Sequence, residues 1–374
     1  MSSYFDYFFK NIDSTNSGHF ISGTCYSMCP HDEAKLREKE RMVHLLEVLG
    51  PVKKLVKCYS RSAADSNVAI PYLLRPYNVL KATVGYLLLE VTKRSDVSTC
   101  VVYDFINDRL RAVRQDMTIQ RLPPEQCINL LEPMIRFYVY YGYKLCEHPI
   151  HDFDPVLNKK YLLECIKWFL SCYDSVQASE NNDNMNEITN CLGGMDLQNA
   201  NGISPICDRV LVESLYILCN LDDVHPLLRY LNLPKDIKSI PIVQLSYKIA
   251  IAHLKGNFIR LCRLMERLCP LTYCAFFIYL PVIQRQSLRV LSVGYNSKQL
   301  SLPTDTVSRW LWLPPAAARE LCAHYGLKAG EDSVHFLKSN FNCDVAVHQP
   351  IKHLLHDKKL NLSVEHIFTY STNE

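Results

Sequence analysis

One stretch of this chain, residues 101–120, constrains the fold more than any other. Its apolar residues recur every three or four positions, the spacing of one stripe along an α-helix; they are Val102, Ile106, Leu110, Val113 and Met117. Charged side chains flank this stripe, namely Asp104, Asp108, Asp116, Arg109, Arg111 and Arg114. Because Asp108 and Arg111 lie one turn apart, we expect ion pairs beside a buried helical face. The pattern alone also suits an ordinary solvated amphipathic helix.

The composition favours a large and mainly helical protein. A chain of 374 residues can build a sizeable core, as one elongated body or two packed modules. Only 12 residues are glycine, which argues against a Rossmann domain or a turn-rich β-barrel, because both need many residues at positive φ. With 41 basic and 38 acidic residues the chain is not polybasic. Any nucleic-acid binding would therefore require a local basic patch.

The 16 cysteines indicate reduced thiols rather than a disulfide framework. The N-terminus lacks the charged and apolar regions of a secretory signal, so we expect a cytosolic or nuclear protein. Many of the cysteines fall in apolar helical patterns, where cysteine packs as a small core residue. The longest apolar run, Leu271–Ile283, is too short to span a bilayer and contains Pro281. It predicts a buried helix.

Helix start and stop signals divide the rest of the chain. A helix from about His31 should end at Gly50-Pro51, and further helices are expected at 76–89, 124–147, 154–173, 209–219, 225–231, 242–254 and 258–268. The turn Lys255-Gly256-Asn257 predicts an αα-hairpin, and recurring hairpins stack into a solenoid. The last third predicts helices at 305–313 and 315–325, strands at 334–337 and 345–347, and one more helix in the tail. Two helices followed by a β-hairpin indicate a winged helix.

Three motifs occur in order along the first part of the chain. They are Gly-Thr-Cys-Tyr-Ser-Met-Cys-Pro at 23–30, Arg-Pro-Tyr-Asn-Val-Leu at 75–80, and Asp-Arg-Leu-Arg-Ala-Val-Arg-Gln-Asp at 108–116, followed by Gln120. Together they resemble the suppressor-of-actin/GANP family, and most of all its short SAC-domain-containing animal members. Beyond about Tyr173 the resemblance rests only on helical-repeat texture and a terminal motif. We expect structural roles for the residues that carry the motifs: Gly23, Cys25, Met28, Cys29, Pro30, Arg75, Pro76, Arg109, Arg111, Arg114, Asp116 and Gln120.

The resemblance implies a PCI-type architecture, a mainly α fold in which stacked, TPR-like helical hairpins end in a winged-helix subdomain. The expected divisions are a flexible N-terminal arm at 1–22, the signature region at 23–175, a polar loop or linker at 176–204, helical repeats at 205–300, the winged helix at 301–348 and a tail at 349–374. The arm carries the aromatic residues Tyr4, Phe5, Tyr7, Phe8 and Phe9. These either pack onto the body or bind a partner.

Motifs of enzymes are absent from the sequence: it contains no phosphate-binding loop, dinucleotide fingerprint, nucleophile elbow or His-Glu-x-x-His. The resemblance implies a non-enzymatic scaffold in nuclear messenger-RNA biogenesis and export, present in nucleus and cytoplasm. Its implied partners are a second PCI-domain protein, a small acidic subunit, and RNA or DNA. The short architecture suggests an alternative, a factor of centrosome duplication, spindle function and mitotic progression, located at centrosome and spindle.

The sequence contains candidate residues for two kinds of binding site, one for nucleic acid and one for a metal ion. The candidates for phosphate contacts at the expected winged helix are Arg285, Arg289, Arg309, Arg319, Lys328 and Lys338. The alternative is that this subdomain only pairs with another winged helix, with Trp310 and Trp312 in its core or interface. His19, Cys25, Cys29 and His31 could bind zinc, but a structural zinc site normally joins two compact ligand pairs. We expect no metal and no cofactor.

Overall fold

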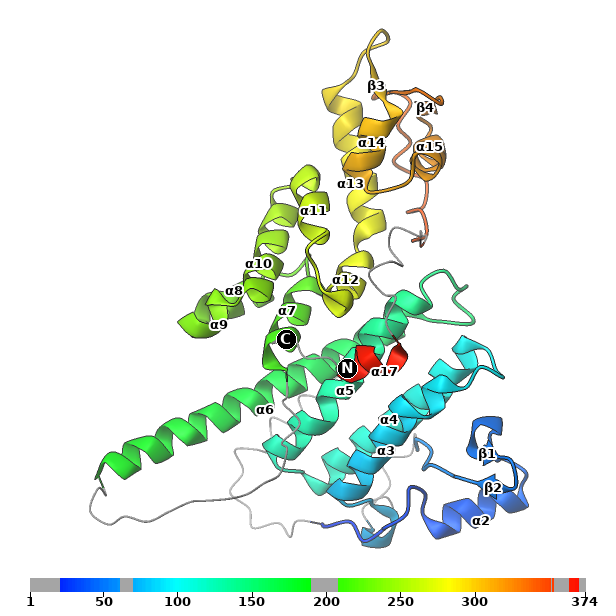
Figure 1. Ribbon diagram of the computed structural model, residues 1–374, viewed down its shortest axis with the longest axis vertical. Coiled ribbons are helices and arrows are strands. Elements are labelled where there is room, and N and C mark those ends of the chain that lie inside the picture. Colours follow the sequence, from blue (N-terminus) through cyan, green and yellow to red (C-terminus); the bar gives the residue numbers. More distant parts are fainter. Residues whose placement is uncertain (1–20, 61–69, 190–207, 351, 353–362, 370–374) are drawn as a thin grey trace. The chain divides into compact units, whose positions relative to one another are not determined.

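The fold is mainly helical, as predicted from the sequence. The computed structural model describes residues 21–60, 70–189, 208–350, 352 and 363–369. The chain divides into two compact units, each described here by itself (Figure 1). Unit 1 comprises Met1–Met134 and Trp168–Pro205, and unit 2 comprises Ile135–Lys167 and Ile206–Glu374. The expected arm lies outside the described residues as far as residue 20.

Unit 1 is built around the helix that the apolar stripe predicted. This helix, α4, runs Thr99–Gln120 and packs against α3, Tyr77–Leu89 (Figure 1). The hydroxyl of Ser98 caps its first turn by accepting from the Val101 amide at 3.4 Å. At its end, Arg121 adopts a left-handed conformation with φ 50°. All five residues of the stripe are buried, which confirms the predicted helix and its core-facing side.

The expected helix from His31 to Gly50 is wrong beyond its first nine residues. The helix α2 covers only His31–Lys39, and Arg41 takes a left-handed conformation with φ 56°. A short 3-10 helix η1, Leu45–Glu47, and a hairpin of β1, Val48–Leu49, with β2, Val52–Lys53, follow. Side-chain capping explains the break: His44 accepts from the Leu46 amide at 3.2 Å, and the Glu47 carboxylate accepts from the His44 amide at 3.0 Å. Gly50 with φ 64° then closes the hairpin.

The remaining elements of unit 1 include two short 3-10 helices, η3 at Pro71–Leu73 and η4 at Val91–Lys93. Two helices also contribute to both units, α5 at Pro124–Lys144 and α6 at Pro155–Thr189. The helix α6 runs well past residue 173, so the polar loop expected from residue 176 is wrong as far as Thr189. Polar composition alone gave that boundary, but it does not exclude a helix, because polar residues have only modestly unfavourable helix propensities. Residues 190–204 of the loop lie outside the described residues.

Unit 2 contains the predicted helical hairpins. Its first helices are α7 at Arg209–Leu218, α8 at His225–Asn232, α9 at Lys235–Ser239, α10 at Pro241–Leu254 and α11 at Phe258–Met265. The helix α10 packs against both α7 and α11. Gly256 has a φ of 63° in the turn before α11, and Asn257 caps that helix by accepting from the Arg260 amide at 3.0 Å. The predicted αα-hairpin is therefore confirmed.

The apolar run predicted as one buried helix forms two helices instead. They are α12, Pro270–Phe277, and α13, Leu280–Gly294. Pro281 occupies the first turn of α13, where a missing amide proton costs nothing, and so it starts a helix rather than lying within one. The run is nevertheless buried, with Leu271, Cys274 and Phe276 fully enclosed. Among the described residues, no helix has both the length and the apolar character needed to cross a membrane.

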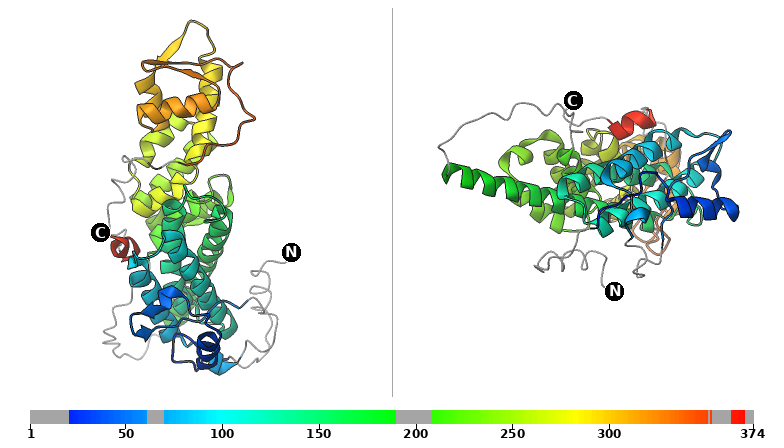
Figure 2. Two further views of the ribbon diagram at one scale, coloured as in Figure 1. Left: turned by 90° about the vertical axis from the view of Figure 1, so that its right-hand side faces the viewer. Right: turned by 90° about the horizontal axis from the view of Figure 1, so that it is seen from below.

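The last part of unit 2 combines two helices with a small sheet. These are β3 at Ser301–Pro303, α14 at Thr304–Leu311, α15 at Pro315–His324, β4 at Lys328–Ala329 and β5 at Ser333–His335. The antiparallel sheet has the order β3-β5-β4. Figure 2 shows this region in yellow and orange. Both helices were predicted, but the strand expected at 345–347 is wrong, because β5 pairs with β4 before it and with the distant β3. The winged-helix assignment stays a prediction.

The tail contributes one further helix to unit 2, as predicted. This helix, α17, covers Val364–Thr369 and buries Ile367 and Phe368. The Phe368 ring lies edge-on to Tyr140 of α5, with ring centroids 6.0 Å apart. In addition, the Arg136 guanidinium donates to the Ile367 carbonyl at 3.3 Å. The tail is therefore attached to the helical body by both an aromatic contact and a hydrogen bond.

Candidate functional site

The buried carboxylate of Asp116 is the centre of the signature region. Its side chain on α4 is fully buried and accepts from two cations: Lys57 Nζ at 2.6 Å and Arg75 Nε at 2.7 Å. Lys57 Nζ also donates to the Leu73 carbonyl at 2.6 Å, and the Arg75 guanidinium donates to the Met28 carbonyl at 3.3 Å. A buried charge is tolerated only when its partners satisfy it. This group therefore fastens the two preceding segments to α4.

Gln120, one turn after Asp116, fixes the glycine of the first motif. Its side-chain oxygen accepts from the Gly23 amide at 2.8 Å, and its side-chain nitrogen donates to the Arg75 carbonyl at the same distance. A Cβ atom on Gly23 would lie 2.3 Å from the Leu74 carbonyl oxygen. Only glycine lets the backbone approach this closely. The three motifs thus meet at one place.

A second buried carboxylate, Glu47, lies on the same unit. The Arg37 guanidinium donates to it and also to the Val56 carbonyl, at 3.1 Å. Arg109 from α4 approaches the other Glu47 oxygen at 3.4 Å, and that oxygen accepts from the Val56 amide at 2.9 Å. Burial would raise the pKa of Glu47, but the Val56 amide and the two guanidinium groups outweigh burial and hold this pKa below its usual value. Glu47 is therefore ionised at neutral pH.

The other signature side chains also point to a structural role. The Cys25 amide donates to the Leu74 carbonyl at 3.0 Å, and Pro30 precedes α2 at its N-cap position. The Arg111 guanidinium lies over the ring of Tyr59, 3.9 Å from its centroid. Arg114 is half-buried on the same helix. Pro76, in turn, precedes the first residue of α3.

Sequence reasoning missed Lys57, Glu47 and Arg37, although each is buried and charged. None of them belongs to a recognised motif, and the α4 partners of Lys57 and Glu47, Asp116 and Arg109, lie far away in the sequence. A charged residue inside an otherwise apolar or extended stretch was the available signal, as in Leu45-Leu46-Glu47-Val48-Leu49. We name the two buried carboxylates with their cations, Asp116 with Lys57 and Arg75, and Glu47 with Arg37 and Arg109, the ionic clamp.

Cys29 of the first motif and the nearby Cys58 lack the lowered pKa of a reactive nucleophile. Burial raises the pKa of Cys29 to about 12, with Glu33 adding to the effect. Burial likewise raises the pKa of Cys58 to about 11. A nucleophilic thiol needs a lowered pKa, because the thiolate is the attacking species. Both thiols are protonated at neutral pH.

The metal hypothesis concerned His19, Cys25, Cys29 and His31. His19 lies outside the described residues, so the full set is not described. Within residues 21–60, 70–189, 208–350, 352 and 363–369, no three His, Cys, Asp or Glu side chains come close enough together to hold a metal ion. Cys25 contacts Ser27 instead, with its Sγ 3.3 Å from the Ser27 carbonyl oxygen.

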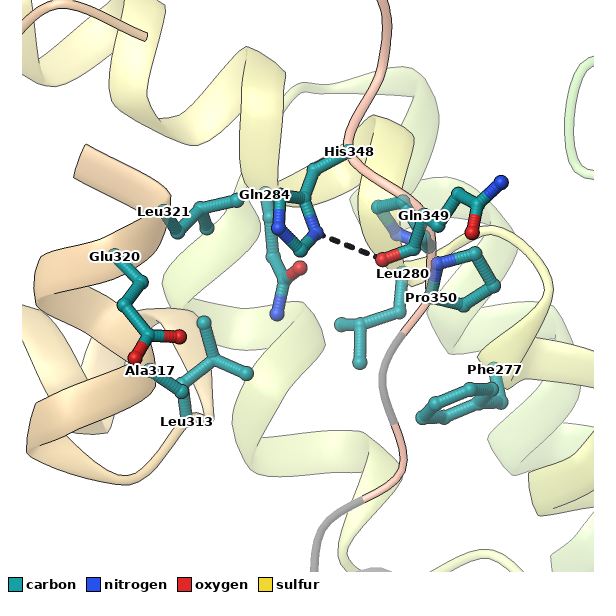
Figure 3. Close-up of a pocket in the computed structure, with 11 residues that line it drawn as sticks. Phe277, Leu280, Gln284, Leu313, Ala317, Glu320, Leu321, His348, Gln349 and Pro350 are labelled. Atoms are coloured by element: carbon teal, nitrogen blue, oxygen red, sulfur yellow. Dashed lines mark hydrogen bonds between the residues drawn. The ribbon is translucent and has the colours of Figure 1, made fainter. Parts of the chain in front are cut away.

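Unit 2 contains a small cavity beside α12, α13 and α15 (Figure 3). Leu280, Gln284, Leu313 and His348 are among the residues that line it, and its volume is about 20 Å³. The His348 ring nitrogen Nδ1 is hydrogen-bonded with the Gln349 carbonyl at 2.7 Å. A cavity of this size holds about one water molecule. It is too small for a substrate or cofactor.

The six basic candidates for nucleic-acid contacts all lie in the last part of unit 2. Arg285 and Arg289 lie on α13, Arg309 on α14, Arg319 on α15, Lys328 on β4, and Lys338 after β5. The half-buried Arg285 donates to the Cys343 carbonyl, whereas Arg309 and Lys338 are exposed. Nothing brings the six together around one shared atom or groove. Their role stays a prediction.

The two tryptophans of this region make contacts with aromatic rings. The Trp312 ring lies 5.6 Å from Tyr273, centroid to centroid, and Trp310 lies 6.4 Å from Tyr295. In addition, the Trp310 carbonyl accepts from the Cys262 thiol at 3.0 Å. Such contacts suit the predicted core role better than base stacking.

Comparison with known proteins identifies the family to which this chain belongs. Residues 28–331 match the profile of the SAC3/GANP family. The chain belongs to the SAC3/GANP family. It is 25% identical over 344 residues to Protein xmas of Drosophila melanogaster, covering 86% of this chain and 15% of that protein. The resemblance inferred from the motifs is therefore confirmed.

Two further relatives of the SAC3/GANP family show the same relation. SAC3 family protein B of Arabidopsis thaliana is 25% identical over 380 residues, which cover 96% of this chain and 21% of that protein. SAC3 family protein 1 of Schizosaccharomyces pombe (strain 972 / ATCC 24843) is 32% identical over 130 residues, covering 33% of this chain and 13% of that protein. The chain thus spans about a fifth or less of the length of these relatives.

Proposed function

We propose that this SAC3/GANP-family chain is a non-enzymatic scaffold of the PCI type that acts in nuclear messenger-RNA biogenesis and export. The observation that carries the proposal is the ionic clamp. Its buried charges pair with one another and with backbone groups, so the signature residues stabilise a fold rather than face a substrate. In an enzyme, perturbed polar groups would instead converge on a cleft.

The thiols support the same conclusion. Cys29 belongs to the first motif, where a thiol-dependent activity would have to lie. Its raised pKa leaves almost no thiolate at neutral pH, and the same holds for Cys58. A cysteine that packs in this way behaves as a small core residue.

The proposed partners are a second PCI-domain protein, a small acidic subunit, and RNA or DNA. Helical hairpins such as α10 with α11 expose long surfaces that suit protein docking. The order of elements β3-α14-α15-β4-β5, with an antiparallel sheet, supports a winged helix that pairs with its counterpart in the partner. We expect the protein in the nucleus and cytoplasm.

Affinity purification from native cells tests this function. The tagged chain is recovered, bound proteins are identified, and RNA that survives nuclease treatment is quantified. The scaffold proposal predicts a PCI-domain protein, a small acidic protein and protected RNA in the same eluate. Recovery of centrosomal or spindle proteins without RNA would contradict it and would support a role in centrosome duplication and mitotic progression. Finding the tagged chain at the spindle by imaging would also support that alternative role.

A further inference from the structure

The surface of α11 and of the turn after it carries three arginines that have no partner among the residues that the structure describes. Arg260, Arg263 and Arg267, on α11 and directly after it, are all exposed. Within the part of the chain that the structure describes, none of their side chains makes an ion pair or a hydrogen bond. Lys53, by contrast, is an exposed cation that pairs with Glu38 at 3.0 Å. Three arginines without such a partner within residues 260–267 concentrate positive charge at this surface.

Arg260 and Arg263 lie on one face of α11. At about 100° per residue their side chains are about 60° apart, and Arg267 follows in the turn after the C-cap residue Glu266. The buried residues of the helix centre about 180° away from this face, since they are Phe258, Leu261, Cys262 and Met265. The helix packs on α10 and α14 through its buried side, so the arginine face points away from the core of unit 2.

The surroundings strengthen the positive charge of this face. Lys255, in the turn before α11, is exposed and adds a fourth cation near the start of the helix. Glu266, the C-cap residue of α11, is the one acidic residue between Phe258 and Leu268. The face thus has a locally positive field although the whole chain carries a formal charge of only +3.

We propose that Arg260, Arg263 and Arg267 form a binding surface for the phosphate backbone of single-stranded RNA. This rests on the nucleic-acid binding of the proposed function, but assigns it to α11 rather than to the predicted winged helix. Guanidinium groups bind phosphate oxygens through forked pairs of N–H donors. A row of charges without recognition of base edges binds independently of sequence and depends strongly on salt.

The chemistry of this face favours a phosphate backbone over an acidic protein. A protein interface usually has an apolar, tightly packed centre with charges at its rim. Here the charges form the centre, and the neighbouring aliphatic residues Ile259 and Leu264 are only half-exposed at its sides. No aromatic residue stands between Ile259 and Arg267 in the chain.

The test is RNA binding by the purified full chain, measured by fluorescence anisotropy with a labelled uridine 20-mer at several KCl concentrations. The first variant, R260Q/R263Q/R267Q, removes the charges but keeps helix-forming residues. The matched control, K35Q/K39Q/K81Q, removes three exposed lysines of unit 1 and changes the net charge equally. A third variant, R309Q/R319Q/K338Q, removes three of the predicted winged-helix contacts.

Loss of three phosphate contacts should lower the slope of log K against log salt by about 2 in magnitude, at about 0.7 per contact with single strands. If the variant and the unmodified chain bind equally at about 1 M salt, a slope difference of about 2 gives a loss of affinity on the order of 50-fold at about 0.15 M salt. The lysine control should bind like the unmodified chain.

Each outcome separates the inference from the proposed function. If the unmodified chain binds RNA and the α11 variant binds it equally tightly, the inference is overturned and the scaffold function stands. A chain that binds no RNA overturns both the inference and the nucleic-acid part of that function. Poly-glutamate binding as tightly as RNA, and lost in the same variant, would assign the face to an acidic protein instead. Circular dichroism of each variant confirms that its helices remain folded.

Discussion

The replacement of Asp116 by Asn gives the sharpest test of the ionic clamp. The substitution keeps the shape of the side chain but removes the charge that holds Lys57 and Arg75, at 2.6 and 2.7 Å. Both cations then remain buried without a counter-charge. Removing one partner of a buried ion pair typically costs about 3 to 5 kcal/mol. That is a large part of the free energy of unfolding of a domain, about 5 to 15 kcal/mol in total.

Urea unfolding measures this loss in unit 1. The three tryptophans of the chain are Trp168, Trp310 and Trp312, and only Trp168 belongs to unit 1. In a background that carries W310F and W312F, tryptophan fluorescence therefore reports on that unit. With a slope of about 2 kcal/mol per molar urea, the midpoint should fall by about 1.5 to 2.5 M.

The matched control is Asp96→Asn. Its carboxylate also receives an Arg94 guanidinium at 2.6 Å, but on the surface, where ion pairs contribute little. We expect an almost unchanged midpoint. In the D116N background, Lys57→Met should restore part of the loss, because it removes one of the orphaned charges. Equal midpoints for D116N and D96N would refute the claim that buried charge pairing holds the signature region together.

Three further predictions concern the same unit and the exposed thiol. The pKa of Glu47 is lowered in the folded state. Its ionised form therefore adds to the free energy of unfolding at neutral pH, and this contribution is lost as the pH falls below about 4.3, the pKa of an unfolded Glu. In urea titrations, the difference in stability between the unmodified chain and Glu47→Gln should shrink over that range. Gly23→Ala should destabilise by about 1 to 3 kcal/mol because its Cβ would overlap the Leu74 carbonyl, whereas Gly85→Ala, with open space in α3, should stabilise by about 0.5 to 1 kcal/mol. A higher melting temperature for Gly23→Ala together with a lower one for Gly85→Ala would contradict this. Among the cysteines that the structure describes, the exposed Cys343 should react first with iodoacetamide at neutral pH, as peptide mass spectrometry would show.

Elements determined by local pattern were predictable from the sequence. The stripe from Val102 to Met117 gave α4, and the turn around Gly256 gave the α10–α11 hairpin. In both cases the residues that decide the structure lie within a few positions of one another. Residue type alone was enough there, since helical periodicity and turn chemistry act locally.

Elements determined by distant partners were not predictable in the same way. The chain after Lys39 leaves the helix, where His44 and Glu47 cap a 3-10 turn and Glu47 binds Arg37 and Arg109. The strand β5 pairs with β4 just before it and with β3, about thirty residues earlier, whereas the local pattern predicted a partner strand after it. The resemblance to the family pointed to the signature residues but not to Lys57, the cation that completes the pairing of Asp116.

The hydrogen bond between Gly23 and Gln120 also sets an order of events during synthesis of the chain. The two residues are 97 positions apart, and translation proceeds at about 5 to 20 residues per second. The first motif is therefore made about 5 to 20 s before the helix that receives it. During this interval Lys57 and Glu47 lack their partners on α4, Asp116 and Arg109. Because a charged group without a partner favours water over an apolar core, we expect the first segment to enter the core only after α4 has been made.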